Sequence, residues 1–157
     1  MKSLPSKIVV DTGPLLLPLT REPGWKKIRS LLSLHEREQI KLYIGLFNIG
    51  ELLHAAHKLG YNYSTATEYA ALTSRELEVV ANAEYALWMG RIKAEAAKQG
   101  YNIPWGNTST IAAALHLNTP ALALNQDKHF NQLAKICSNL GIQVNIIRVK
   151  DLPATET

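Results

Sequence analysis

Residues 7–14 read KIVVDTGP, and this stretch decides the fold. The uninterrupted β-branched run at residues 8–10 is typical of a strand that is buried inside a parallel sheet. Asp11 ends the run, and a turn-forming Thr-Gly-Pro follows it. Open α/β sheets bind ligands at the carboxyl ends of their strands, so Asp11 is a candidate site residue. A second interpretation, in which Asp11 only caps the following helix, stays open from this stretch alone.

Strand-like and helix-like segments alternate along the rest of the chain. Further strands are predicted at residues 40–46, 77–81, 120–124 and 143–147. Helices are predicted at residues 25–34, 47–59, 64–74, 83–99, 107–117 and 128–140, with one helical turn at 15–19 that Pro18 breaks. This alternation predicts an α/β fold with three α/β/α layers and a central parallel sheet of about five strands.

The bulk composition predicts one domain over residues 1–157, with a core at about 7–148 and a frayed tail. A hydrophobic content of 46% and a charged content of 19% are typical of a soluble globular protein. The net charge of +4 fits a polyanionic partner without requiring one. Cys137 is the only cysteine, which excludes an intrachain disulfide and a thiolate zinc site.

The sequence also bears on membranes and location. No apolar run reaches the roughly 18 residues that a membrane span needs, so we expect no membrane association. The first residues, MKSLPSK, lack a long apolar region, so we expect no signal peptide. Together with the single cysteine, these features favour a cytoplasmic protein.

Four polar residues lie at or just after the predicted strand ends, namely Asp11, Glu51, Asn107 and Asp127. Each has a structural interpretation as a helix cap, and Glu51 stands in a capping-box relation to Asn48. Two carboxylates on one edge of a sheet repel each other unless a cation lies between them. A magnesium or manganese ion is the natural candidate, because hard divalent cations prefer oxygen ligands.

Three motifs resemble those of the PIN domain, the metal-dependent ribonuclease fold of VapC-type toxins and of RNA-processing factors. They are VVDT at residues 9–12, NIGELL at 48–53, and the IAAA and DKHF segments between 111 and 130. The last is the most specific, because an alanine-rich helix, a short strand and D-x-x-F recur in that order in the family. The resemblance covers nearly the whole chain and implies a PIN-like fold.

The resemblance implies that Asp11, Glu51 and Asp127 are catalytic and bind Mg2+ or Mn2+. The family's other aspartate opens the alanine-rich helix, and that position corresponds to Asn107 here. A neutral amide oxygen is expected to hold a divalent cation less tightly than a carboxylate. Three outcomes therefore stay open: an active enzyme with weakened metal affinity, a one-metal enzyme, or an inactive PIN-like scaffold.

Further residues are predicted to support this site. Thr12 and Asn48 could donate hydrogen bonds there, and both could equally be plain caps. Asn125 stands two residues before the last aspartate, where the family usually has Thr or Ser. Trp105 could stack on a base, pack at a subunit interface or join the core.

The resemblance implies a magnesium- or manganese-dependent endoribonuclease that hydrolyses RNA phosphodiester bonds. It further implies the toxin of a toxin–antitoxin pair, with an antitoxin protein as inhibitor and a homodimer as the assembly. The alternative is a catalytically weakened PIN-like module that binds RNA or protein, which Asn107 favours. A third hypothesis is a phosphotransferase with Asp11 as covalent nucleophile. Such enzymes usually carry a second Asp two residues on, where this chain has Gly13.

Overall fold

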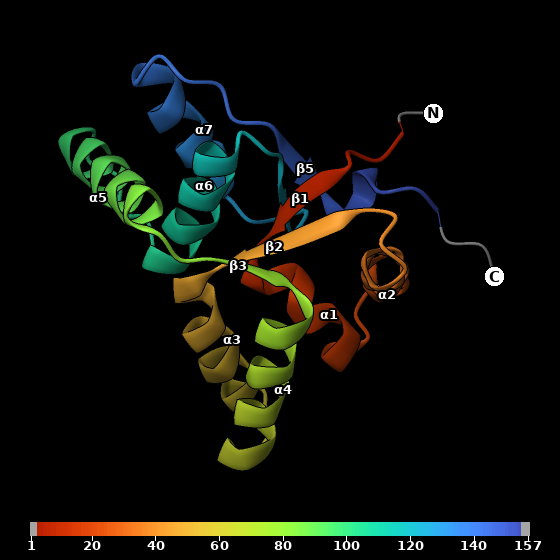
Figure 1. Ribbon diagram of the computed structural model, residues 1–157. Helices are drawn as coiled ribbons and strands as arrows, with labels where there is room; N and C mark the ends of the chain where they lie inside the picture. The colour runs from red at the N-terminus through yellow and green to blue at the C-terminus, as the bar shows by residue number, and fades with distance from the viewer. Residues whose placement is uncertain (1–2, 155–157) are drawn as a thin grey trace.

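The computed structural model describes residues 3–154, in which a five-stranded sheet lies between two layers of helices (Figure 1). The strands are β1 (Lys7–Val10), β2 (Lys41–Gly45), β3 (Glu78–Val80), β4 (Ala121–Ala123) and β5 (Ile146–Arg148). All neighbouring strands are parallel, in the order β3-β2-β1-β4-β5. The predicted α/β/α fold class, with a parallel sheet of about five strands, is confirmed.

The helices divide between the two faces of the sheet. They are α1 (Thr12–Thr20), α2 (Trp25–Glu36), α3 (Leu46–Lys58), α4 (Tyr63–Glu76), α5 (Ala83–Lys98), α6 (Trp105–Leu117) and α7 (His129–Asn139). Helices α5, α6 and α7 cover one face, and α1 to α4 lie on the other side (Figure 1). Within residues 3–154, no helix combines the length and the apolar character that crossing a bilayer requires.

Strand β1 lies at the centre of the sheet, between β2 and β4. Ile8 and Val10 belong to the core on the side of α1 and α2, and Val9 belongs to the core on the side of α5 to α7. All three side chains are fully buried, and each contributes about 2 kcal/mol by leaving water. This burial on both faces is the physical reason for the uninterrupted β-branched run.

Helix α6 is the most deeply buried helix of the described residues. Every residue from 106 to 114 is buried, so the helix needs small side chains around its whole circumference, and its buried polar side chains need hydrogen-bond partners. The three alanines at 112–114 meet this need. The helix begins at Trp105, two residues before the predicted start, and the Thr108 N–H donates to the carbonyl of Pro104 at its cap.

Helix α1 continues through Pro18, so the prediction of one helical turn broken at that proline is wrong. Proline removes one backbone hydrogen bond of the helix. The helix persists because Leu15 and Leu17 are buried in the core beside β1. It ends at Arg21, whose backbone is left-handed with φ 56° and whose N–H donates to the Leu17 carbonyl.

The packed part of the chain extends further toward the C-terminus than we predicted from the sequence. Strand β5 begins three residues after the predicted start at 143. Val149 opens a short 3₁₀ helix (Val149–Asp151), and both Val149 and Leu152 are buried in the core. The packed chain therefore passes the predicted core boundary at 148. The prediction of a frayed tail also covers residues 155–157, which lie outside the described residues.

Candidate metal and phosphate site

The carboxyl ends of β1 and β4 meet where the strand order of the sheet reverses. From β1 the chain moves outward to β2 and β3, and it later returns to β4 on the other side of β1. The Asp11 N–H donates to the Leu122 carbonyl of β4 at 3.0 Å, which places Asp11 at this reversal. Asp127 follows β4 after a short loop. Such a switch point is the usual ligand-binding position of open α/β sheets.

Asp11 is only 4% exposed, although it is an acid at the end of a strand. It occupies the N-cap position of α1, but its side chain makes no capping hydrogen bond. Instead, the Thr110 hydroxyl of α6 donates to Asp11 Oδ1 at 2.6 Å. The carboxylate is thus held from the opposite helical layer, and the interpretation of Asp11 as a plain cap is wrong.

The electrostatic environment of Asp11 is unfavourable to its ionised form. Burial raises the pKa of Asp11 from an ordinary 3.8 to about 7, and the hydrogen bond from Thr110 partly opposes this rise. The negative charges of Glu51 and Asp127 raise the pKa further, while the Thr12 N–H lowers it. Glu51 and Asp127 therefore lie close enough to Asp11 to act on its charge. The fold thus brings the three predicted carboxylates into the same region of the protein.

Asn48 is a buried hub between three helices. Its Nδ2 amide group is within donating distance of Thr12 Oγ1 at 3.1 Å, the Gly106 carbonyl at 3.0 Å and Glu51 Oε1 at 3.4 Å. Asn48 is the third residue of α3 and not its N-cap, which is Gly45, so the predicted capping box is wrong. The amide instead orients Glu51 and ties α1, α3 and α6 together at the site.

The Glu51 carboxylate rests directly on the backbone of α6 at Gly106. A Cβ atom added at position 106 would overlap both oxygens of Glu51. Gly106 is therefore required here for the close approach of a side chain rather than for its backbone angles. A side chain at this position would force the Glu51 carboxylate to move.

Asp127 is fixed by two hydrogen bonds. The Asn107 side chain donates from Nδ2 to Asp127 Oδ2 at 2.9 Å, and the His129 N–H donates to Oδ1 at 3.0 Å. Asn107 is only 9% exposed and lies within α6, so it is not the N-cap that the cap interpretation required. The amide of Asn107 thus faces a carboxylate that would repel an aspartate at the same position.

Asn125 does not join this cluster. Its Oδ1 accepts from the Lys150 N–H at 2.7 Å, so the side chain joins the end of β4 to the C-terminal 3₁₀ helix. The carboxylates of Asp11 and Asp127 are surrounded by the other predicted residues, namely Thr12, Asn48, Glu51 and Asn107. The catalytic role of each of these residues stays a prediction.

Two residues at the site were not predicted. Thr110 lies three positions after Asn107 on the same face of α6, and this helical spacing is a signal that could have found it. Arg148 donates from Nη1 to the carbonyls of Leu124 and Asp127 at 2.7 and 3.0 Å. It therefore fixes the loop that carries Asp127, and nothing in the local sequence indicates this role.

A further layer of hydroxyls supports the start of α3. The hydroxyls of Tyr85 and Ser109 are hydrogen-bonded to each other, and the Phe47 N–H donates to the Tyr85 hydroxyl at 3.2 Å. Gly45 leaves the space for this contact, because a Cβ there would overlap the Ser109 hydroxyl. Helices α3, α5 and α6 are thereby locked to one another next to the carboxylates.

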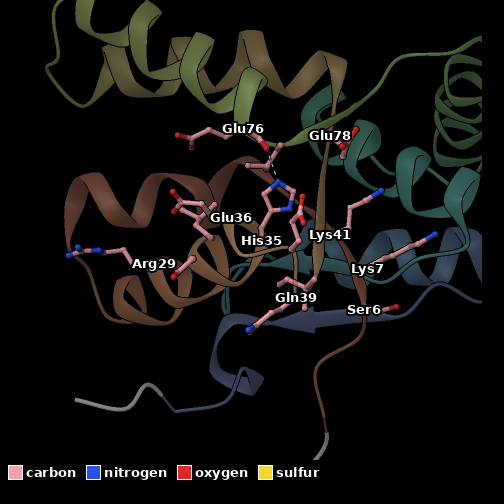
Figure 2. A pocket seen from close by; sticks show the side chains of 14 residues that line it. Ser6, Lys7, Arg29, His35, Glu36, Gln39, Lys41, Glu76 and Glu78 are labelled. Carbon is pink, nitrogen blue, oxygen red and sulfur yellow. Dashed lines mark hydrogen bonds between the residues drawn. The ribbon is translucent and has the colours of Figure 1, made fainter.

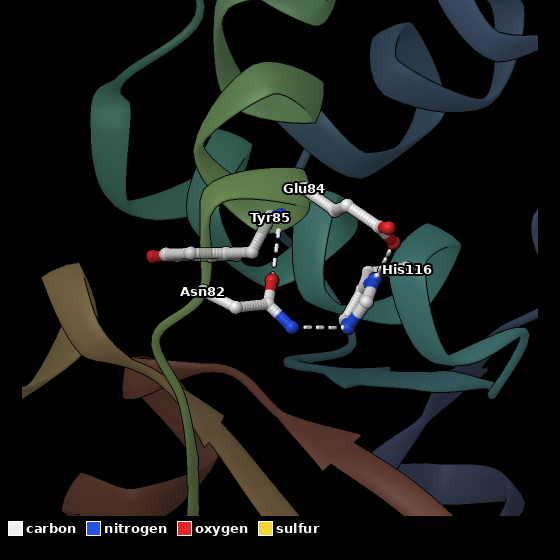
Figure 3. Close-up of polar contacts among 4 residues, drawn as sticks. All are labelled: Asn82, Glu84, Tyr85 and His116. Atoms are coloured by element: carbon white, nitrogen blue, oxygen red, sulfur yellow. Dashed lines mark hydrogen bonds and ion pairs between the residues drawn. The ribbon is translucent and has the colours of Figure 1, made fainter.

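Tyr85 is held in turn by the start of α5, as Figure 3 shows. The Asn82 side chain caps α5 by accepting from the Tyr85 N–H at 3.0 Å. Its amide nitrogen lies 2.7 Å from His116 Nε2, and His116 Nδ1 lies 3.1 Å from Glu84 Oε2. Because the Asn82 amide nitrogen can only donate, His116 Nε2 accepts this hydrogen bond. His116 Nδ1 therefore carries the hydrogen and donates it in a hydrogen bond to Glu84. This network is structural and joins α5 to α6.

A depression of about 1040 Å³ lies at the amino-terminal ends of β1 and β2, at the end of the sheet opposite to the carboxylates (Figure 2). Lys7 and Lys41 line it from the first residues of β1 and β2, and none of the predicted site residues does. His35 lies in it with both ring nitrogens engaged, Nδ1 accepting from the Leu42 N–H and Nε2 donating to the Glu76 carbonyl. Lysine, arginine and glutamate side chains surround the depression together, so it selects for neither sign of charge.

The donor atoms of the carboxylate site suit a hard divalent cation. Within residues 3–154, no lysine or arginine forms an ion pair with Asp11, Glu51 or Asp127. The same residues contain no group of three His, Cys, Asp or Glu side chains arranged to hold a metal ion. Mg2+ is commonly held by only one or two carboxylates together with water and phosphate. The residues therefore fit such a sparsely coordinated ion and do not form a closed metal cage.

Comparisons with known proteins bear on the fold. No protein-family model matches the sequence. No curated protein matches it. Solved structures with similar folds include VapBC2 from Rickettsia felis, bound to a DNA fragment from its promoter, with a TM-score of 0.65 at 12% identity over 90% of this chain and 98% of that one.

Two further complexes contain similar chains. VapBC-1 from nontypeable Haemophilus influenzae has a TM-score of 0.65 at 19% identity, over 92% of this chain and 98% of the other. DNA-bound VapBC from Salmonella typhimurium has a TM-score of 0.66 at 18% identity, over 91% and 98%. The similar chains in these complexes are VapC toxins, which are PIN-domain proteins. The protein described here therefore has the PIN-domain fold, as the motifs in its sequence predicted.

Proposed function

We propose that this protein is a metal-dependent endoribonuclease and the toxin of a toxin–antitoxin pair. One observation carries the proposal: Asp11, Glu51 and Asp127 lie near one another at the switch point of the sheet, and among residues 3–154 none of them forms an ion pair with a lysine or an arginine. The PIN-domain fold shared with VapC toxins gives this arrangement its context. The net charge of +4 suits an RNA substrate.

The chain's own residues divide the work in this proposal. Asp11 and Glu51 would hold the divalent cation, Mg2+ or Mn2+, and a cation there would supply positive charge to polarise the scissile phosphate. Thr110 keeps Asp11 in place, and Asn48 keeps Glu51 in place. In this proposal, Asp127 would accept a proton from the attacking water. The reaction is hydrolysis of an RNA phosphodiester, and it needs no covalent nucleophile.

A second candidate function is a PIN-like module that binds RNA or protein without efficient cleavage. The hydrogen bond from Asn107 to Asp127 favours it, because it occupies an oxygen that a metal or a water molecule would otherwise use. An amide at 107 also leaves the site one negative charge short of the set that the resemblance implies. Both properties lower the affinity for a divalent cation.

The partners follow from the same fold. Chains with this fold occur in complexes named VapBC, some solved with DNA. By analogy, we expect an antitoxin protein that covers the carboxylate edge and blocks access of RNA. We further expect a homodimer in the cytoplasm.

The test is an RNA cleavage assay on the wild type, Asp11→Asn and Glu68→Gln, each with MnCl2 or with EDTA. Glu68 is an exposed carboxylate on α4 and serves as the matched control. We expect Mn2+-dependent cleavage by the wild type and by Glu68→Gln, and a loss of roughly 100-fold or more in Asp11→Asn. Equal cleavage by Asp11→Asn contradicts the proposal. RNA binding without cleavage in every sample supports the binding module.

A further inference from the structure

Two exposed aromatic rings lie beside the carboxylate site. Phe47 at the start of α3 is 47% exposed, and Trp105 at the start of α6 is 48% exposed. Their ring centroids are 6.4 Å apart, and the ring planes are inclined by 42°. The chain has two other tryptophans, Trp25 and Trp88, and each is more buried than Trp105. We call Phe47 and Trp105 the aromatic platform.

The backbone ties the platform to the site. Phe47 precedes the hub residue Asn48, and Trp105 precedes Gly106, whose carbonyl accepts from Asn48 at 3.0 Å. Phe47 also lies one helical turn before Glu51, so both side chains leave α3 on the same side. Both rings therefore project from helix positions that adjoin the Glu51 carboxylate.

A positive charge accompanies the rings. The Lys93 ammonium group lies 4.7 Å from the centroid of the Trp105 ring and donates to the Ile103 carbonyl at 2.6 Å. This position on α5 is a cation–π contact that keeps the charge at the edge of the platform. The platform thus combines a π surface with one cation, next to a site proposed to act on phosphate.

We infer that the aromatic platform stacks an unpaired nucleobase of the RNA substrate, with Lys93 facing a phosphate of the same strand. The inference rests on the proposed function and adds a base-binding subsite to it. Sequence-tolerant binding of single strands combines aromatic stacking with positive charge along the backbone, and both elements are present here. The substrate class is therefore single-stranded RNA, or a loop with a base free to leave its stack.

The dimensions of the platform favour a base over a protein partner. A stable protein interface buries about 800 Å² on each partner. Two half-exposed rings, together with the exposed Leu46 beside Phe47, form a patch of three apolar side chains, fewer than the roughly 20 residues that each partner of such an interface contributes. The Phe47 N–H donates to the Tyr85 hydroxyl, and the Trp105 ring contacts both Phe47 and Lys93, so neighbouring groups orient the two rings.

The experiment measures binding of a 5′-labelled, mixed-sequence single-stranded RNA by fluorescence anisotropy. The protein carries Asp11→Asn, so that RNA stays intact in the presence of MnCl2. Trp105→Ala and Phe47→Ala are compared with Trp105→Phe, which keeps a ring, and with Leu87→Ala. Leu87 is 68% exposed on α5 and is the matched control for loss of an exposed apolar side chain. Sedimentation of each variant reports its oligomeric state.

We expect Trp105→Ala to weaken RNA binding roughly 5- to 150-fold, the effect of losing one stacked base, and Trp105→Phe to restore most of it. RNA should also quench tryptophan fluorescence, and this quenching should be lost in Trp105→Phe. Unchanged affinity in Trp105→Ala overturns the inference. A change of oligomeric state with unchanged affinity also overturns it and assigns the platform to self-association.

The outcome separates this inference from the proposed function. If the wild type does not cleave RNA but its binding depends on Trp105, the subsite stands and the nuclease proposal fails. If the wild type cleaves RNA with Mn2+ but, in the Asp11→Asn background, adding Trp105→Ala does not weaken RNA binding, the subsite fails alone. If no variant binds RNA, the inference is overturned.

Discussion

The Thr110 hydroxyl donates to Asp11 Oδ1 at 2.6 Å, across 99 positions of sequence and from one helical layer to the other. Replacing Thr110 by Val removes this donor from a buried carboxylate and keeps the shape of the side chain. We expect the free energy of unfolding at pH 8 to fall by about 1–3 kcal/mol. Urea unfolding measures it, and Thr110→Ser, which keeps the hydroxyl, is the control. Equal stability of the Val and Ser variants would show that the hydrogen bond contributes nothing.

The raised pKa of Asp11 makes stability depend on pH. The pKa is about 7 in the folded protein and near 3.8 when unfolded, so the folded state binds more protons between these values. This difference in proton binding stabilises the folded state fully below about pH 4, and the stabilisation is lost as the pH rises to 7. Its full size is on the order of 4 kcal/mol.

Urea unfolding in EDTA at pH 4.5 and pH 7.5 measures this effect. Asp11→Asn cannot ionise, so the variant should gain stability relative to the wild type at the higher pH. The same pH dependence in wild type and variant would assign it to other groups and leave Asp11 without a role in it.

Gly106→Ala tests the close contact between α6 and Glu51. The new methyl group overlaps the Glu51 carboxylate, which can shift because it is the end of a flexible side chain, so we expect little change in stability but a strong loss of RNA cleavage. Gly90→Ala is the matched control, since Gly90 also lies in a helix but has open space around it. That variant should be neutral or more stable by up to about 1 kcal/mol. If Gly106→Ala retains wild-type cleavage, Glu51 is not needed where it lies.

Asn107→Asp places a carboxylate against Asp127 and removes the hydrogen bond between them. In EDTA at pH 8 we expect a loss of about 1–2 kcal/mol in stability, because the two charges repel. MnCl2 should then raise the melting temperature more in this variant than in the wild type. Asn107→Ala removes the hydrogen bond without adding charge and should show no larger response to Mn2+. Equal Mn2+ responses in all three proteins would exclude residue 107 from metal binding.

The fold could be predicted because it depends on patterns that are visible in short stretches of the sequence. The buried run before Asp11 and the alternation of segments determine the parallel sheet, and the structure confirms them. The predicted break at Pro18 was wrong because burial of neighbouring leucines outweighs one lost hydrogen bond. Tertiary packing therefore outweighed the low helix propensity of proline.

The site could be predicted only in part. Asp11 and Asp127 follow strands, so their positions can be read from the alternation. The capping roles of Asn48 and Asn107 were wrong, because both helices begin earlier than their sequences indicate. Arg148 was missed because its contact with the loop of Asp127 depends on tertiary structure alone.

The most direct test of the central claim is a calorimetric titration of Mn2+ into the wild type and Asp11→Asn at pH 8. Glu68→Gln again serves as the control for loss of a carboxylate. If Asp11 and Glu51 hold the cation, the wild type and Glu68→Gln should bind Mn2+ alike, and Asp11→Asn should bind roughly tenfold more weakly or worse. Equal Mn2+ affinity in the wild type and Asp11→Asn, or no binding by the wild type, would contradict a metal site at the switch point.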